Sequence, residues 1–310
     1  MRRSTAVRAA AVTVLAAGVA APLVRRRLRL KPPVVLGAAA ATPFAVCVLF
    51  PRSRKRDFLT CLLQMYAYVT AYKMPYDDPE ALVRRVKVAY PVKLDRLVGG
   101  GTTPTLRLQR ALGTPGVFRA WEKLLIWSHW FWFAFPHGTV LYLILRHPER
   151  VNRGAGRIYA TFDIGLLGYW AIPTAPPWYA AAEGYMEDGR TPELRRMMVE
   201  YGEQFWRSGW APLYGVLGGN PLAAMPSLHF ATSVSAAHVL AETGRGAALV
   251  GWAYTALLGT ALVYLGEHYV VDLMAGLALA EGVRAGAPAA VPLARRVSAA
   301  VQAIEVRARA

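Results

Sequence analysis

The sequence predicts an all-α membrane protein: a polytopic helical bundle with a core of about six transmembrane helices and one or two hydrophobic segments at the N-terminus. The first observation is composition, because 55% of the 310 residues are hydrophobic and only 18% are charged, with a mean hydropathy of +0.27. Such a chain is too apolar for a soluble domain and too long for a single membrane anchor. The other two observations are that long apolar stretches recur, and that basic residues gather beside them.

The apolar stretches give the expected helices in order. Residues 58–72 form a short stretch that contains Thr60, Gln64 and Thr70, and we expect it to span the membrane as well. Polar regions at 73–123 and 176–224 interrupt the series. The stretches that approach the length of a bilayer span are residues 6–24, 33–50, 124–145, 158–173, 226–240, 247–265 and 270–283.

The basic residues predict the orientation of the chain. A net charge of +17 would suit nucleic acid, but the arginines lie beside apolar stretches, so we expect a bilayer and no nucleic-acid partner. Arginines at 146–157 separate two expected spans and arginines at 284–296 follow the last one, so both groups should be cytoplasmic. The polar region 176–224 and the turn at 266–268 then lie on the extracytoplasmic face of the plasma membrane. The basic run at 25–31 does not fit this scheme, which leaves the topology of residues 1–72 open.

A first motif lies where a polar region meets an apolar helix, in residues 220–229, Asn-Pro-Leu-Ala-Ala-Met-Pro-Ser-Leu-His. Pro226 suits the first helical position, where an N–H has no partner within the helix. The free amide groups of such a helix start, together with the helix dipole, attract an anion such as a phosphoryl group. We therefore expect His229 to lie beside bound phosphate, and Asn220, Pro226 and Ser227 to contact the substrate.

A second motif opens the next apolar helix, in residues 264–272, Tyr-Leu-Gly-Glu-His-Tyr-Val-Val-Asp. His268 and Asp272 are four residues apart and share one helix face, where the carboxylate can accept a hydrogen bond from the imidazole. That bond would fix the tautomer and leave the other ring nitrogen free to attack, as in a catalytic triad. Ionisable residues at the ends of membrane spans are costly unless they have a use. The remaining histidines, at 129, 137, 147 and 238, lack such a setting, and we interpret them as structural.

Residues 225–229 and 264–272 resemble the second and third motifs of the type 2 phosphatidic acid phosphatase superfamily. Residues 169–178, Tyr-Trp-Ala-Ile-Pro-Thr-Ala-Pro-Pro-Trp, and residues 220–225 resemble its inositol phosphorylceramide synthase branch. The resemblance covers roughly residues 124–286. It implies a bundle of about six helices with its site at one membrane face. It also implies a metal-free and cofactor-free mechanism in which His268 forms a phosphohistidine, Asp272 orients it and His229 protonates the departing oxygen.

The resemblance divides the chain and adds one substrate contact. Residues 1–56 would be N-terminal hydrophobic segments, residues 57–290 a membrane-embedded catalytic domain and residues 291–310 a basic cytoplasmic tail. Tyr264, at the start of the second motif, is expected to contact the substrate.

The chain lacks cations that phosphatases of this superfamily carry. Ala261 and Leu262 occupy the place of a Ser-Arg pair, and no basic residue lies in the expected place around residues 173–177. Each lost charge-assisted hydrogen bond is worth about 1.5 to 3 kcal/mol, so another group must bind the phosphate. Loop arginines can restore that contact. The candidates are Arg190 and Arg207, with Arg195 and Arg196 nearby in sequence.

These observations predict an integral membrane enzyme of lipid metabolism that transfers a phosphoryl headgroup between lipids. A monoester dianion needs the missing cations most, so the losses favour a phosphodiester donor. The expected partners are a phospholipid or lipid-phosphate substrate and an alcohol acceptor such as inositol. The alternative is a lipid phosphate or isoprenoid diphosphate phosphatase, which would not depend on the acceptor.

Two further hypotheses remain. The chain would be a non-catalytic lipid-binding protein if the missing cations mark lost chemistry, although the intact His229, His268 and Asp272 argue against this. A metal held by the same three residues is the least favoured, because a helix N-terminus suits an anion better than a cation. Cys47 and Cys61 lie in apolar stretches and predict neither a disulfide framework nor a zinc site.

Overall fold

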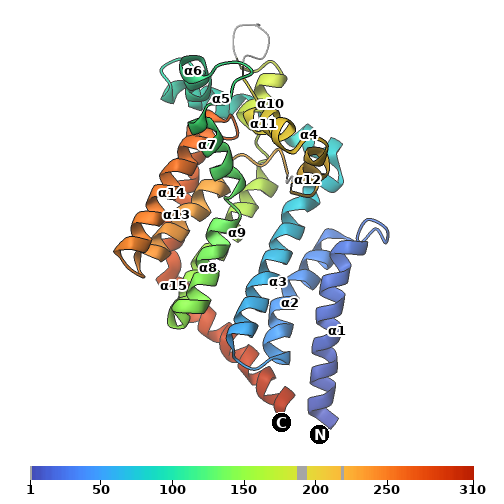
Figure 1. Ribbon diagram of the computed structural model, residues 1–310. Coiled ribbons are helices and arrows are strands. Elements are labelled where there is room, and N and C mark those ends of the chain that lie inside the picture. The colour runs from blue at the N-terminus through green and yellow to red at the C-terminus, as the bar shows by residue number, and fades with distance from the viewer. Residues whose placement is uncertain (1, 187–193, 218–219) are drawn as a thin grey trace. The chain divides into compact units, whose positions relative to one another are not determined.

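The computed structural model describes residues 2–186, 194–217 and 220–310, and every regular element in these ranges is a helix (Figure 1). The all-α fold predicted from the sequence is confirmed. The chain forms two compact units. The first contains Met1–Asp77, Val140–Tyr159 and Val283–Ala310, and the second contains Asp78–Thr139 and Ala160–Gly282. The division into residues 1–56, 57–290 and 291–310 stays a prediction.

Several helices are apolar enough for a membrane protein. Ser4–Val24 within α1 (Arg2–Val24), α2 (Pro32–Leu49) and α14 (Arg245–Tyr264) each have the length and composition to cross a bilayer. α13 (Leu228–Ala241) is apolar but shorter, with 14 residues. The helical membrane bundle is confirmed, and about six spans stays a prediction.

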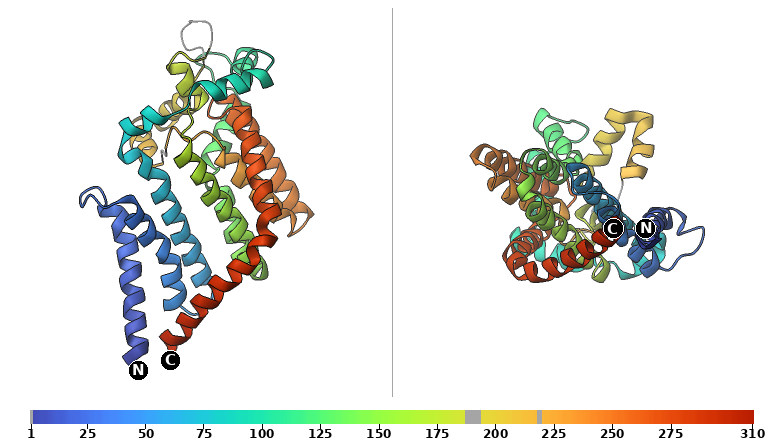
Figure 2. Two further views of the ribbon diagram at one scale, coloured as in Figure 1. Left: turned by 180° about the vertical axis from the view of Figure 1, so that it is seen from behind. Right: turned by 90° about the horizontal axis from the view of Figure 1, so that it is seen from below.

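The first unit is built on α1, α2 and α3 (Arg54–Lys73), which pack side by side in chain order (Figures 1 and 2). Arg25 donates at 2.7 Å to Asp77, the last residue of the short helix η1 (Met74–Asp77). Arg56 lies 3.1 Å from Glu305, and their side chains are only 10% and 8% exposed. Glu305 belongs to α15 (Val270–Arg309), so this buried ion pair fastens the end of α15 to the start of α3. Residues 291–309, expected as a basic tail, continue this helix.

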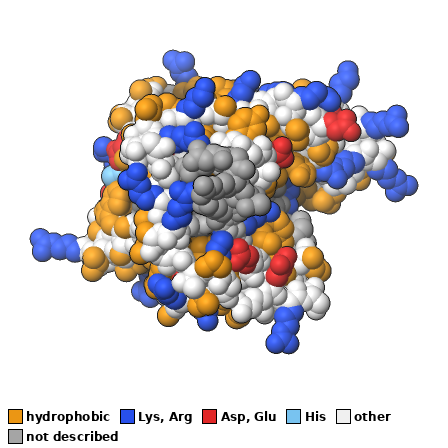
Figure 3. All heavy atoms as spheres, turned by 90° about the horizontal axis from the view of Figure 1, so that it is seen from above, with side chains coloured by type: hydrophobic (Ala, Val, Ile, Leu, Met, Phe, Trp, Pro, Cys, Tyr) orange, Lys and Arg blue, Asp and Glu red, His pale blue; other side chains and the backbone are white. Residues whose placement is uncertain are grey.

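The second unit is built on α13 and α14, which form an antiparallel helix pair, with α7 (Ala120–Trp130) packed against α14 (Figure 1). Short helices gather at one end of this unit, and Lys and Arg side chains are spread over the face seen from above (Figure 3). These short helices are α4 (Pro79–Arg85), α5 (Ala89–Val98), α6 (Pro104–Leu112), α10 (Pro177–Ala182), α11 (Met197–Trp206), η3 (Arg207–Gly209) and α12 (Trp210–Leu217).

One expected span is interrupted. Stretch 124–145 forms α7 and α8 (Ala134–Arg146), separated by a turn at residues 131–133. The turn places the Trp132 ring against α13, where its Nε1–H donates to Oγ1 of Thr232 at 3.1 Å. A tertiary hydrogen bond therefore competes with continuation of the helix. Beyond α8 the chain passes through the short helix η2 (Pro148–Arg150) into α9 (Val151–Ala171).

Candidate active site

Backbone pairing between loops supports the segment that carries the first motif. Thr174 lies between two other segments, because its N–H donates to the Leu222 carbonyl at 3.1 Å and its carbonyl accepts from Ala224 N–H at 3.0 Å. On the other side, Ala175 N–H donates to the Lys87 carbonyl at 3.0 Å. The buried Asn220 turns this segment, since its Oδ1 accepts from Leu222 N–H at 3.0 Å. These bonds fix the approach to His229.

The helix that bears His229 begins at Leu228, two residues later than the sequence predicted. Ser227, not Pro226, defines the start of α13, because the Ser227 hydroxyl accepts from Phe230 N–H at 3.3 Å in an N-cap. The Pro226 carbonyl accepts from the Tyr169 hydroxyl at 2.8 Å, and Tyr169 Oη accepts from Leu228 N–H at 3.2 Å. Two amides of the helix start therefore already have protein partners. The N-terminus alone is a weaker anion site than expected.

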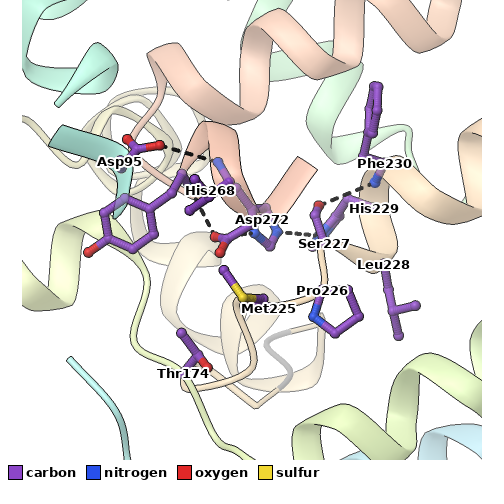
Figure 4. Close-up of polar contacts among 12 residues, drawn as sticks. Asp95, Thr174, Met225, Pro226, Ser227, Leu228, His229, Phe230, His268 and Asp272 are labelled. Atoms are coloured by element: carbon purple, nitrogen blue, oxygen red, sulfur yellow. Dashed lines mark hydrogen bonds and ion pairs between the residues drawn. The ribbon is translucent and has the colours of Figure 1, made fainter. Parts of the chain in front are cut away.

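The second motif forms the turn between α14 and α15. Gly266 has φ +79°, a left-handed conformation that glycine adopts without strain. His268 and Asp272 are buried, at 3% and 0% exposure, and Nδ1 of His268 lies 3.3 Å from Oδ2 of Asp272 (Figure 4). The same Oδ2 accepts from Tyr269 N–H at 2.9 Å, which holds the carboxylate in place.

His229 and His268 are in direct contact. Nδ1 of His229 lies 3.1 Å from Nε2 of His268 (Figure 4). If Nδ1–H of His268 donates to Asp272, Nε2 of the neutral ring is an acceptor, and Nδ1–H of His229 must donate to it. This tautomer leaves a lone pair on Nε2 of His268 and a proton on Nδ1 of His229. A nucleophile and a proton donor then face each other.

One backbone bond joins the two motifs. Ser227 N–H donates to the Asp272 carbonyl at 3.0 Å, between the cap of α13 and the first turn of α15. Gly276, one turn further along α15, lies so close that an added Cβ would be 2.6 Å from the Ser227 carbonyl oxygen. Close packing of α15 on the start of α13 therefore sets the distance between His229 and His268.

The other residues that the sequence predicted to contact the substrate lie at different places in the structure. The Tyr264 hydroxyl is buried and donates to Oε1 of Glu122 at 2.7 Å, so its hydrogen bond lies within the protein interior. Arg207 is exposed in the turn between α11 and α12. Arg190 lies outside the described residues. Pro226 and Ser227 are in the backbone framework of the site, and Asn220 turns the loop before it.

Sequence reasoning missed residues that pack against the site. The rings of His129 and Trp132 lie 4.8 and 4.1 Å from the His229 ring, measured between centroids. Both nitrogens of His129 are buried without a hydrogen-bond partner among the described residues. The carboxylate of Asp95 accepts from Val271 N–H, next to Asp272. His129 was hidden in an aromatic run and Asp95 in a mixed-charge region, so spacing gave no signal for either.

The missing cations are not restored at their expected place. Ala261 and Leu262 are both 0% exposed, in an apolar interior where an arginine would be desolvated. Arg195 is occupied, because it pairs with Glu200 at 2.7 Å and donates to the Thr114 carbonyl at 2.8 Å.

Arg196 is the arginine that lies toward the second motif. Its guanidinium stacks on the Trp178 ring at 3.6 Å and donates to the Tyr214 hydroxyl at 2.7 Å, and Trp178 N–H donates to the Gly266 carbonyl. Burial raises the pKa of Glu267, while Arg196 and His268 act in the opposite direction. Arg196 is thus electrostatically coupled to the residue that precedes His268.

The sequence of this chain matches a known protein family. Residues 117–285, more than half of the chain, match the family model of the PAP2 superfamily. The chain belongs to the PAP2 superfamily. The matched range includes His229, His268 and Asp272, whereas Asp95 precedes it.

Two curated relatives lie in one branch of the PAP2 superfamily by name. A phosphoinositol dihydroceramide synthase from Bacteroides thetaiotaomicron is 35% identical over 121 residues, covering 38% of this chain and 39% of that protein. An inositol phosphorylceramide synthase from Candida albicans is 26% identical over 261 residues, covering 81% of this chain and 50% of that protein. The chain thus spans half or less of the length of these relatives. No solved structure matches it.

Proposed function

We propose that this PAP2 superfamily member is a lipid headgroup phosphotransferase that works through a phosphohistidine on His268. The main observation is the chain of contacts from Asp272 through His268 to His229, at 3.3 and 3.1 Å. The names of the two curated relatives support transfer of a phosphoinositol headgroup. The proposed donor is a phospholipid with a polyol headgroup, and the proposed acceptor is a hydroxyl of a second lipid or of a free alcohol such as inositol.

The proposed reaction has two displacements at phosphorus. In the first, Nε2 of His268 attacks the donor phosphodiester, a P–N bond forms, the P–O bond to the lipid breaks and His229 protonates the leaving oxygen. In the second, His229 takes the proton of the acceptor hydroxyl, which attacks phosphorus and releases His268. Asp272 holds Nδ1–H throughout and stabilises the positive ring of the intermediate. Because the two ring nitrogens are only 3.1 Å apart, the rings must separate to admit the substrate.

Charge supports a diester donor over a monoester. The buried Ala261 and Leu262 remove one cationic contact with phosphate. A phosphodiester carries one negative charge, and one loop cation can balance it. We propose Arg196 for this role, since its guanidinium is held by Trp178 and Tyr214 beside the turn that carries His268. A lipid phosphate phosphatase remains the second candidate function.

The basic segments support a membrane location and an orientation of the chain in that membrane. We propose that the protein lies in the plasma membrane with the short helices of the second unit on the extracytoplasmic face. Arg150 lies in η2 between α8 and α9, and Arg153 lies in the first turn of α9, as expected at a cytoplasmic connection. Lipid donors of the outer leaflet would then have access to His268.

The test is transfer of a labelled headgroup from a panel of phospholipids by purified protein in detergent. Reactions are run with and without ceramide, and with and without inositol. Acceptor-dependent transfer that is lost in His268→Ala supports the proposal. Release into water alone makes the protein a phosphatase. His147→Gln is the matched control, because that histidine contacts Tyr142 in the first unit, and its transfer rate is expected to stay unchanged. Turnover that survives in His268→Ala would overturn the mechanism.

A further inference from the structure

Asp95 is a buried carboxylate beside the catalytic motif. It lies on α5 and is 0% exposed. Its Oδ1 accepts from Val271 N–H at 3.2 Å, in the first turn of α15 and one residue before Asp272 (Figure 4). Its Oδ2 is also buried and has no hydrogen-bond partner among the described residues. The backbone amides of Val271 and Val270 both act on this carboxylate, which therefore caps the first turn of α15.

None of the cations in the described part of the chain acts on the pKa of Asp95. The cluster around α5 at this point is apolar, with Val92 on α5 and Ala180 on α10. α6 also packs against α5 and carries Arg107 and Arg110, and neither arginine contributes to the pKa of Asp95. The charge of Asp272 raises the pKa of Asp95, and the charge of Asp95 in turn raises the pKa of Tyr269. Both partners belong to the second motif.

Burial raises the pKa of Asp95 to about 6, the backbone hydrogen bonds from Val271 and Val270 lower it in part, and the nearby charge of Asp272 raises it further. An ionised Asp95 is thus costly to the fold at neutral pH. A helix start needs no buried charge, since Ser227 caps α13 with a neutral hydroxyl. Asp95 is thus a charged cap of α15, where Ser227 is a neutral cap of α13, and the dipole of α15 offsets part of the cost of its charge.

We propose that Asp95 is a positioning residue for the reaction at His268, acting through α15 and Asp272. Its Oδ1 fixes the first turn of α15, and its negative charge adds to that of Asp272. Attack by Nε2 of His268, whose Nδ1 keeps its proton, produces a positively charged phosphoimidazole. Two neighbouring carboxylates stabilise that cation better than one. The inference rests on the proposed phosphohistidine mechanism and adds a group from outside the matched family range.

The charge and the hydrogen bond can be separated by substitution. Asp95→Asn keeps an oxygen that can accept from Val271 N–H but removes the charge. Asp95→Ala removes both. Asp78→Asn is the matched control, because Asp78 also accepts a backbone N–H, from Ala81 at 2.9 Å, at the exposed start of α4. The readouts are kcat, donor KM, the pH profile of kcat and the amount of alkali-stable phosphohistidine after rapid quenching.

The wild-type kcat is expected to rise with pH near pH 6, as Asp95 ionises. Asp95→Asn should lower kcat about tenfold at neutral pH and reduce phosphohistidine, with donor KM unchanged and the rise near pH 6 lost. Asp78→Asn should keep the wild-type profile. A wild-type kcat and profile in Asp95→Asn would overturn this inference alone. Absence of His268-dependent turnover in the wild type would overturn the proposed function and, with it, the inference.

Discussion

At the residue scale, Asp272 is held more firmly than a surface carboxylate. Oδ2 accepts from both His268 Nδ1 and Tyr269 N–H, and the backbone carbonyl of the same residue accepts from Ser227 N–H. Oδ1 is buried and has no partner among the described residues. Orientation of the imidazole therefore depends on a single oxygen whose position is fixed by a backbone amide.

Asp272→Asn tests this orienting role. An amide that turns its NH₂ toward Nδ1 of His268 donates to that nitrogen, which moves the ring proton to Nε2 and removes the lone pair there. An amide that keeps its oxygen in this place lacks the charge that stabilises the positive ring of the intermediate. We expect kcat to fall by about 10³- to 10⁴-fold while the protein stays folded. Transfer kinetics and thermal unfolding in detergent measure the two effects. A loss of less than tenfold would argue that Asp272 does not orient the nucleophile.

Arg196→Gln tests the proposed phosphate contact. Loss of one charge-assisted hydrogen bond to the donor should raise KM by about 10- to 100-fold, with partial rescue in Arg196→Lys. Donor titrations at saturating acceptor give KM directly. Arg207→Gln is the competing variant, because the sequence proposed Arg207 and the structure leaves it exposed. If Arg207→Gln raised the donor KM and Arg196→Gln did not, the phosphate contact would belong to Arg207.

Asp95 should also make stability depend on pH. The pKa of Asp95 is about 6 in the folded protein, above the ordinary value of 3.8, so the folded state binds the proton more tightly than the unfolded state. Its contribution to stability is therefore largest at low pH and falls as pH rises through about 6. The melting temperature of Asp95→Asn relative to the wild type should rise between about pH 4 and 6 and level off above that range. A difference that is constant with pH would show that Asp95 does not titrate in this range.

The four-residue spacing predicted that His268 and Asp272 meet, but the shared helix face was wrong, because His268 lies in the turn just before α15, which begins at Val270. Contact between His229 and His268 followed from the resemblance, since 39 residues and two helices separate them. Asp95 and His129 approach the site from α5 and α7, elements whose packing no local pattern reveals. The roles of all these residues stay predictions.

At the scale of elements, the contact of α15 with the start of α13 controls the site. Gly276 on α15 faces the Ser227 carbonyl, so a methyl group there must push the two elements apart. The apolar stretches predicted the bounds of α13 and α14 to within a few residues. A helix that is apolar over its whole length can be located from hydropathy alone, without a periodic pattern. The break between α7 and α8 could not be predicted, since it depends on a hydrogen bond from Trp132 to another helix.

Gly276→Ala should therefore damage activity more than its small size suggests. The added Cβ would lie 2.6 Å from a backbone oxygen that cannot rotate away. We expect a loss of stability of about 1 to 3 kcal/mol and a larger relative loss of kcat, as His229 and His268 move apart. Gly282→Ala on the same helix has open space around its Cβ and should be neutral or stabilising. Equal behaviour of the two variants would contradict the role of this contact.

At the scale of the whole molecule, net charge and hydropathy predicted a membrane protein, and the distribution of arginines predicts its orientation. In that predicted orientation, α5 would be extracytoplasmic and the end of α15 cytoplasmic. Both helices carry an exposed leucine, Leu97 at 78% and Leu293 at 66%. These two positions allow the same substitution to be compared on the two faces.

Labelling of single cysteines in intact cells decides the orientation. Cys47 and Cys61 are first replaced by Ala, and Leu97→Cys or Leu293→Cys is introduced into that background. Because basic segments stay in the cytoplasm, a membrane-impermeant maleimide should label Leu97→Cys in intact cells and Leu293→Cys only after permeabilisation. The reverse pattern would place the short helices and His268 in the cytoplasm, and donor lipids would then have to come from the inner leaflet. Labelling of both in intact cells would mean that α15 does not cross the membrane.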